Sequence, residues 1–263
     1  MLPTTLGTES IGKLLRQFAI PAIIAMTASS LYNMVDSIFI GQGVGTLAIS
    51  GLAVTFPFMN LAAAFGSLVG VGASTMISVK LGQKDYDTAR KVLGNVVSLN
   101  IIIGILFTVI SLLFLDPILY FFGASSNTIS YARDYMIIIL CGNIITHCYL
   151  GLNSAMRSSG MPKQAMAATI LTVVLNAILD PIFIFVFDLG IAGAAYATIL
   201  AQIVSLVWLI ISFSHKDKVM HFTRKGFRLE KRIVLSSLSI GMSPFLMNVA
   251  ACLIVIVINR TLF

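Results

Sequence analysis

The sequence predicts an all-α polytopic membrane protein, and three observations support this prediction. Hydrophobic residues make up 58% of the 263 residues, charged residues only 10%, and the mean hydropathy is +0.98. A soluble domain, by contrast, is about half apolar and about a quarter charged. The apolar residues also form runs of about 20 or more, long enough to cross a bilayer core as helices. Finally, the basic residues gather between alternate runs.

Seven apolar runs are long enough to be transmembrane helices, each of which needs about 20 residues. The first run carries Pro21 in its interior and has no small-residue cleavage site at the expected distance, so we expect no cleavable signal peptide. The predicted spans are Leu14–Ile40, Ala48–Val79, Val92–Leu115, Ile129–Met156, Ala165–Phe187, Ile191–Phe213 and Ile233–Phe263.

The formal net charge of +7 is distributed in a way that orients the chain in a membrane. If the N-terminus is cytoplasmic, all but two of the 17 Lys and Arg residues fall on the cytoplasmic side of the predicted spans. Cytoplasmic loops of membrane proteins carry such an excess of Lys and Arg. We therefore expect a multi-pass protein of the cell membrane, with a cytoplasmic N-terminus and no nucleic-acid partner.

The segment 214–232, SHKDKVMHFTRKGFRLEKR, divides the chain. Its charge density far exceeds that of the spans before it, so we interpret it as a cytoplasmic basic linker, which could also bind anionic lipid. Residues 1–213 then form an N-terminal unit of six spans, and residues 233–263 form a seventh span. Aligning the early prolines of the first and seventh spans indicates that the seventh opens a second, related and incomplete unit.

Asp36 is an acid inside an apolar stretch, NMVDSIFIG. A carboxylate at membrane depth costs at least a few kcal/mol, so it usually binds a cation, a proton or a substrate. Tyr32 and Asn33 come four and three residues earlier and fall near the same helical face. A phenol and an amide would then accompany the carboxylate. Alternatively, Asp36 lies at the outer membrane interface.

Asp180 is a second intramembrane acid, in the stretch LNAILDPIFIF. Asn176, four residues earlier, shares its helical face, and Pro181 follows directly. Proline removes a backbone donor and disfavours helix at the residue before it. We therefore expect the helix to bend here and to free carbonyl oxygens near the acid, which suits Na⁺ or a proton. Alternatively, Asp180 caps a helix break and is satisfied locally.

Two further residues bear on these acids. The small residues of GIAGAAYATILAQ let the sixth span approach its neighbours closely, so Thr198 could offer its hydroxyl to an acid. It could equally bond to its own backbone. Pro21 interrupts the hydrogen-bond ladder of the first span, which favours a kink. That kink could be a hinge that lets Asp36 move, or a static bend.

The sequence lacks several motifs that would indicate enzymes. It contains no Walker P-loop, no HExxH and no GxSxG, so we predict neither an internal ATPase nor another enzyme. A pump without an ATPase must use an ion gradient, with H⁺ or Na⁺ as the coupling ion and no cofactor. The three cysteines, Cys141, Cys148 and Cys252, fall in predicted spans and are interpreted as buried thiols, not metal ligands.

The stretches LYNMVDSIFIGQ, GASSNTISYARDYMIIIL, NSAMRSSGMPKQAM, VLNAILDPIFIF and GIAGAAYATILAQ resemble the multidrug and toxic compound extrusion (MATE) family across nearly the whole chain. The resemblance implies a cation-coupled antiporter of twelve helices in two six-helix lobes. This chain would hold the six-helix MATE-type lobe plus the first helix of the second lobe. The resemblance also implies a cation site made of two acids, an amide and a hydroxyl: Asp36, Asn176, Asp180 and Thr198. Tyr135 falls near this site, and Pro21 matches the family's proline.

One departure from the family bears on coupling. Some relatives use a glutamate in the seventh helix, whereas this helix reads PFLMNVAACLIVIVINRTLF and has no acid. The first lobe is therefore the better candidate for coupling. When two carboxylates lie close together, they can share one proton.

We therefore predict an antiporter that uses H⁺ or Na⁺ to export drugs or other organic compounds, expected to be cationic, across the cell membrane. Tyr32, Asn33 and Tyr135 are assigned to the substrate cavity, and Pro21 to a hinge. The only metal expected is a possible Na⁺ at the cation site. The expected partners are a small organic substrate, membrane lipid and the missing C-terminal lobe.

Two alternatives remain open. A flippase of a lipid-linked substrate would need cationic residues deep in the spans, and the sequence shows none there. A non-transporting membrane module would use both acids structurally.

Overall fold

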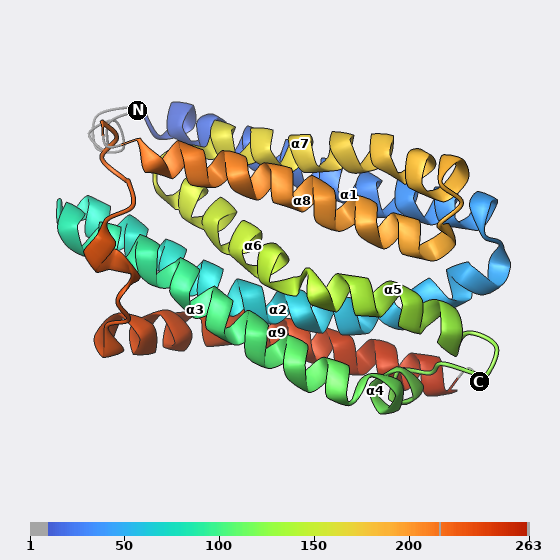
Figure 1. Cartoon of the computed structure of the whole chain (residues 1–263). Helices are drawn as coiled ribbons and strands as arrows, with labels where there is room; N and C mark the ends of the chain where they lie inside the picture. The colour runs from blue at the N-terminus through green and yellow to red at the C-terminus, as the bar shows by residue number, and fades with distance from the viewer. Residues whose placement is uncertain (1–9, 216, 262–263) are drawn as a thin grey trace.

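The structure, a computed structural model, describes residues 10–215 and 217–261 and, within them, the side chains other than those of residues 255 and 257–261. The last two residues of the predicted seventh span lie outside this range. Long helices run along the molecule, and the described ranges contain no strand (Figure 1). The predicted all-α membrane fold is confirmed. Six helices are long and apolar enough to cross a membrane, or seven if one bent pair is counted as a single span.

The elements follow one another as α1 (Ile11–Gly43), α2 (Thr46–Gly82), α3 (Tyr86–Leu113), α4 (Leu115–Phe121), α5 (Ile129–Cys141), α6 (Asn143–Ser158), α7 (Pro162–Pro181), η2 (Ile182–Val186), α8 (Gly190–Ser214), η3 (Arg224–Phe227) and α9 (Lys231–Thr261). The predicted boundaries at residues 213 and 232 stay a prediction, although α8 ends and α9 begins close to them.

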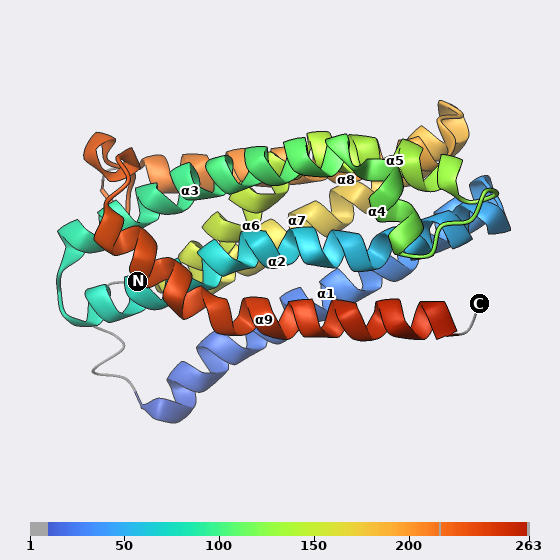
Figure 2. The same cartoon turned by 90° about the horizontal axis from the view of Figure 1, so that it is seen from below.

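The helices form two groups that α6 joins. The first group is α1, α7 and α8, and the second is α2, α3 and α9, with α6 running diagonally between them (Figure 1). In the view from below, α9 runs beside α2 (Figure 2). The α2–α3 turn, the α6–α7 turn and the α8–α9 linker all lie at the end where α1 begins. The basic residues of these connections therefore share one end of the molecule.

Glycines on α2 allow its neighbours to come close. A Cβ atom at Gly70 would lie 3.2 Å from the Cα atom of Gly151 on α6. On another face of α2, a Cβ atom at Gly72 would collide with the carbonyl group of Ser237 on α9. Such backbone-to-backbone contacts are typical of packed transmembrane helices, in which small residues line the interface. They place α2 at the centre of the described fold.

The connection from α2 to α3 is a tight turn with a capped helix start. The Asp85 carboxylate accepts a hydrogen bond of 3.2 Å from the backbone N–H of Thr88, which satisfies one of the free donors of the first turn of α3. The side-chain and backbone hydrogen bonds from Thr88 lower the pKa of Asp85. This cap fixes where the third span begins.

Two spans depart from straight α-helices. The fourth span, predicted as Ile129–Met156, consists of α5 and α6 at an angle of 57°. At the join, a Cβ atom on Gly142 would collide with the Ile199 side chain of α8. The expected bend at Pro181 takes another form, because α7 passes there directly into the π-helix η2. Proline has no N–H to complete the α-helical ladder, and the wider π turn follows it.

Candidate functional site

The two intramembrane acids meet inside the bundle. Asp36 on α1 is 4% exposed and Asp180 on α7 is fully buried. Their carboxyl groups lie within hydrogen-bonding reach of each other. The 25-residue span that contains Asp180 continues beyond it through η2, so this acid does not cap a helix end. Two acids predicted separately from the sequence therefore form one cluster.

Polar side chains from α7 and α8 surround the acids. The Asn176 amide donates hydrogen bonds to Asp180 Oδ1 at 3.0 Å and to Thr198 Oγ1 at 3.4 Å. The Thr198 hydroxyl also pairs with the Tyr32 hydroxyl at 2.8 Å. Tyr135, buried on α5, lies beside the same threonine and the two acids. The structure thus brings Tyr32, Tyr135 and the four residues of the proposed cation site together.

Three oxygen atoms of this acid cluster have no hydrogen-bond partner among the described residues. They are Asp36 Oδ1, Asn176 Oδ1 and Asp180 Oδ2. A buried polar atom without a partner costs about 1–3 kcal/mol, and more if it is charged. Carboxylate and amide oxygens are the ligands that hard cations such as Na⁺ prefer, by analogy with Ca²⁺ and Mg²⁺. A cation or a proton would satisfy these atoms.

Asn33 and Pro21 lie apart from the acid cluster. Asn33 is exposed, and its amide donates a hydrogen bond of 3.2 Å to the Ser29 carbonyl on its own helix. It lines a pocket beside the cluster instead. Pro21 is buried within α1, nearer its beginning, and α1 continues through it as one helix of 33 residues.

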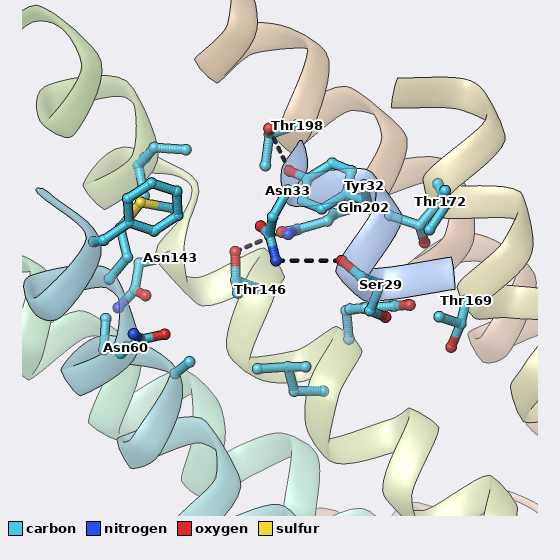
Figure 3. Close-up of a pocket in the computed structure, with 18 residues that line it drawn as sticks. Ser29, Tyr32, Asn33, Asn60, Asn143, Thr146, Thr169, Thr172, Thr198 and Gln202 are labelled. Atoms are coloured by element: carbon cyan, nitrogen blue, oxygen red, sulfur yellow. Dashed lines mark hydrogen bonds between the residues drawn. The ribbon is translucent and has the colours of Figure 1, made fainter. Parts of the chain in front are cut away.

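The pocket has a volume of about 550 Å³ and lies between α1, α2, α6, α7 and α8, with one residue from α5 (Figure 3). None of its 18 lining residues is an acid or a base. Tyr32 and Thr198 belong both to this lining and to the acid cluster. These two side chains therefore form the boundary between the pocket and the buried acids.

Sequence reasoning missed most of the polar side chains that line this pocket. They are Ser29, Asn60, Asn143, Thr146, Thr169, Thr172 and Gln202. Helical spacing could have found some of them, because Thr169, Thr172 and Asn176 recur on one face of α7. The pair between Thr146 Oγ1 and Gln202 Oε1, at 2.5 Å, joins α6 to α8 across 56 positions of sequence, which no local spacing indicates.

The fold and these residues agree with known proteins. The profile of the MatE family matches residues 21–182, which is more than half of the chain. The chain belongs to the MatE family. The resemblance predicted from the sequence is thereby confirmed, and we describe the chain as a multi-pass membrane protein of this family.

Curated relatives include the multidrug export protein MepA of Staphylococcus haemolyticus, which is 32% identical over 95% of this chain and 56% of its own length. MepA of Staphylococcus aureus is 30% identical over 90% of this chain and 52% of its own length. The chain therefore spans about half the length of the curated relatives it matches.

Solved MATE structures superpose closely on this chain. One, a MATE protein in complex with MaD3S, is 28% identical and has a TM-score of 0.87, covering 94% of this chain and 56% of its own. An outward-facing multidrug resistance MATE transporter is 29% identical and has a TM-score of 0.83, covering 89% of this chain and 52% of its own.

Proposed function

We propose that this MATE chain is the N-terminal lobe of an antiporter that exports drugs or other organic compounds in exchange for H⁺ or Na⁺. Relatives named multidrug export proteins, which match 90–95% of the chain, support export as the activity. Because the chain spans about half of their length, we infer that a second lobe completes the transporter.

The three unpartnered oxygen atoms of the acid cluster are the observation on which coupling rests. With both carboxylates ionised, Asp36 and Asp180 repel each other at low dielectric. A bound H⁺ or Na⁺ cancels this repulsion and gives the free oxygen atoms a ligand. Cation binding therefore favours a conformation in which α1 and α7 stay close together at this level.

The pocket is the proposed place for the exported compound. Its volume of about 550 Å³ lies in the range of about 300–1,000 Å³ that small-molecule sites occupy. Its lining is uncharged, so a cationic compound would be attracted by the acids behind Tyr32 and Thr198 rather than by a direct ion pair. A change of charge at the acids would reach the pocket through these two side chains, which couples the two sites.

The proposed movement involves α1. Pro21 lies between the basic end of the molecule and Asp36, on a helix of which only 6% of the apolar window is buried. Pro21 has no backbone N–H and therefore donates no hydrogen bond within the helix, so a bend at this residue does not cost such a bond. We propose that it is the hinge on which Asp36 approaches or leaves Asp180.

The proposed orientation places the N-terminus in the cytoplasm and the protein in the cell membrane. The basic connections gather at the end where α1 begins, whereas α4 lies at the other end (Figure 1). The α4 residue Asp116 forms an ion pair of 2.6 Å with Arg133 of α5. Under the positive-inside rule the first of these ends is cytoplasmic.

The absence of Lys and Arg from the pocket lining favours an exporter of organic compounds over a flippase. A lipid-linked diphosphate needs cationic partners in its site. The pocket offers hydroxyl and amide groups instead.

The deciding experiment is drug efflux from cells that express the natural-length protein, under imposed Na⁺ and pH gradients. We expect Asp180→Asn to lose gradient-driven efflux at normal membrane abundance, because an amide cannot supply the charge that the cation neutralises. Asp134→Asn, which neutralises an exposed acid on α5, is the matched control and should leave efflux unchanged. Full efflux by Asp180→Asn under either gradient would overturn coupling through this cluster and would point to coupling through the second lobe.

A further inference from the structure

The segment between α8 and α9 has a defined place on α3. Asn95, which is 3% exposed, donates hydrogen bonds to the carbonyl oxygens of Gly226 at 2.9 Å and Arg228 at 3.1 Å. Its own side-chain oxygen accepts a hydrogen bond of 3.1 Å from the backbone N–H of Glu230. A single buried amide therefore holds three residues of this connection, which the sequence alone does not indicate.

Further contacts attach the same segment. The Ser98 hydroxyl donates to the Phe227 carbonyl at 2.8 Å, and Lys91 forms an ion pair with Glu230 at 2.7 Å. The backbone of Gly226 lies so close to Gly94 that a Cβ atom on Gly94 would collide with it. Residues 224–230 are thus fixed against the beginning of α3.

The attached segment presents cations and apolar side chains to the outside. Arg224, Lys225 and Arg228 are exposed, and none forms an ion pair within residues 10–215 and 217–261. Between and beside them, Phe227 is 42% exposed and Leu229 is 40% exposed. We call these five residues the linker surface. Glu230, which follows Leu229 in the sequence, forms an ion pair with Lys91.

The linker surface lies at the end of a lipid-facing stripe. Ser98, which holds Phe227, is followed on the same face of α3 by Ile102, Ile105 and Val109, at spacings of four, three and four residues. These three are 41%, 45% and 50% exposed. In a multi-pass membrane protein such an exposed apolar face contacts lipid. The bond from Ser98 places the exposed Phe227 at the end of this face that is nearest the basic end of the bundle.

We propose that the linker surface binds the phosphate groups of anionic phospholipids at the membrane boundary. Arg224, Lys225 and Arg228 contact the headgroups, while Phe227 and Leu229 enter the layer just below them. Basic clusters next to a membrane helix attract anionic lipid with about 1 kcal/mol for each cation, and aromatic side chains favour the interface. The bound lipid holds the connection between α8 and α9 at a fixed depth. This binding does not depend on the proposed transport.

The test compares two double variants of the natural-length protein in nanodiscs of phosphatidylcholine and phosphatidylglycerol. Lys225→Gln/Arg228→Gln removes two cations from the linker surface. Arg157→Gln/Lys163→Gln removes two from the same end of the molecule, and Arg157 faces a groove between α1, α2 and α6. Spin-labelled lipids measure the preference for phosphatidylglycerol over phosphatidylcholine. We expect the first variant to lose about fivefold for each cation and the control to change less than about twofold.

A third variant tests whether lipid binding depends on the position of the cations or only on the net charge of the protein. Asn95→Ala keeps every cation but removes the bonds that hold residues 226–230, so we expect it to lose preference as the linker variant does. Unfolding temperatures measured in phosphatidylcholine alone show whether each variant remains folded. If Asn95→Ala does not fold, Ser98→Ala is used in its place. Three results would each overturn the proposal. They are equal losses of preference in the linker variant and its control, an unchanged preference in a folded Asn95→Ala or Ser98→Ala variant, and no loss of preference in the linker variant. The last result would mean that another part of the protein covers this surface.

Discussion

Thr198 connects the acid cluster to the pocket at the scale of single residues. Its hydroxyl pairs with the Tyr32 hydroxyl at 2.8 Å and accepts a hydrogen bond of 3.4 Å from the Asn176 amide. It is also part of the pocket lining. One small side chain therefore bonds to residues on α1 and α7, and its removal should affect both sites.

We expect Thr198→Val to destabilise the protein by about 1–3 kcal/mol, because the shape is kept while buried partners lose a hydrogen bond. It should also weaken the dependence of efflux on the coupling ion. Thr198→Ser keeps the hydroxyl and should stay close to wild type. Thermal unfolding in detergent, with and without Na⁺, measures the first effect. Thr75→Val, at an exposed position on α2, is the control, and equal stability of the two valine variants would contradict the expectation.

Helical spacing predicted the contacts within a helix better than those between helices. Asn176 and Asp180 are four residues apart and do bond to each other. Tyr32 and Asn33 were both placed near Asp36, yet only Tyr32 contacts its cluster. They lie on opposite sides of Asp36 around the helix, and α7 and α8 pack on the Tyr32 side. The bond between Tyr32 and Thr198 spans 166 positions, so only tertiary packing could reveal it.

At the scale of elements, two glycines bring the backbones of α2 and α9 into direct contact. Cβ atoms at Gly72 and Gly241 would collide with the carbonyl groups of Ser237 and Leu68, so both helix backbones touch directly. Phe65 and Phe245 pack edge to face further along the same pair, with ring centroids 4.9 Å apart. If α9 is the first helix of a second lobe, this contact joins the two lobes.

We expect Gly72→Ala to destabilise the protein by about 1–3 kcal/mol, because the added methyl group meets backbone and cannot be accommodated by a rotamer change. Helix propensity alone predicts the opposite sign, since alanine is favoured over glycine in a helix. Gly82→Ala on the same helix meets nothing within 4 Å and is the matched control. The unfolding temperatures in detergent decide the question, and a Gly72→Ala variant as stable as the control would show that the helices separate freely.

The spans themselves could be predicted because length and hydropathy determine them, whereas their bends could not. The fourth span bends by 57° at Gly142, where the sequence has no proline and the backbone comes close to the Ile199 side chain of α8. At Pro181 the sequence does contain a proline, and the helix adapts through a π turn instead of ending. The local sequence indicates where the hydrogen bonding of a helix is interrupted, and the packing of neighbouring helices determines whether the helix bends, ends or continues there.

At the scale of the whole molecule, burial is uneven. Half of the apolar window of α2 is buried inside the chain, but only 17% of that of α9 and 6% of that of α1. These two helices stand at the edge of the described bundle, and their uncovered apolar faces must meet lipid or further protein. Relatives about twice as long as this chain make a second lobe the natural partner for part of this surface.

If a second lobe completes the transporter, cation binding and transport can be tested separately. The residues of the acid cluster all come from α1, α5, α7 and α8, so the 263 residues alone should still bind the coupling ion. Alternating access requires two bodies that move against each other, so the same 263 residues should not export drugs. Raising the Na⁺ concentration, or lowering the pH at fixed Na⁺, should increase the unfolding temperature of the purified chain, because a ligand that binds only the folded state stabilises it. Asp180→Asn should abolish this increase. Efflux from cells that express only these residues would contradict the two-lobe mechanism, whereas stabilisation without efflux would place the cation site in this lobe and the transport cycle in the pair.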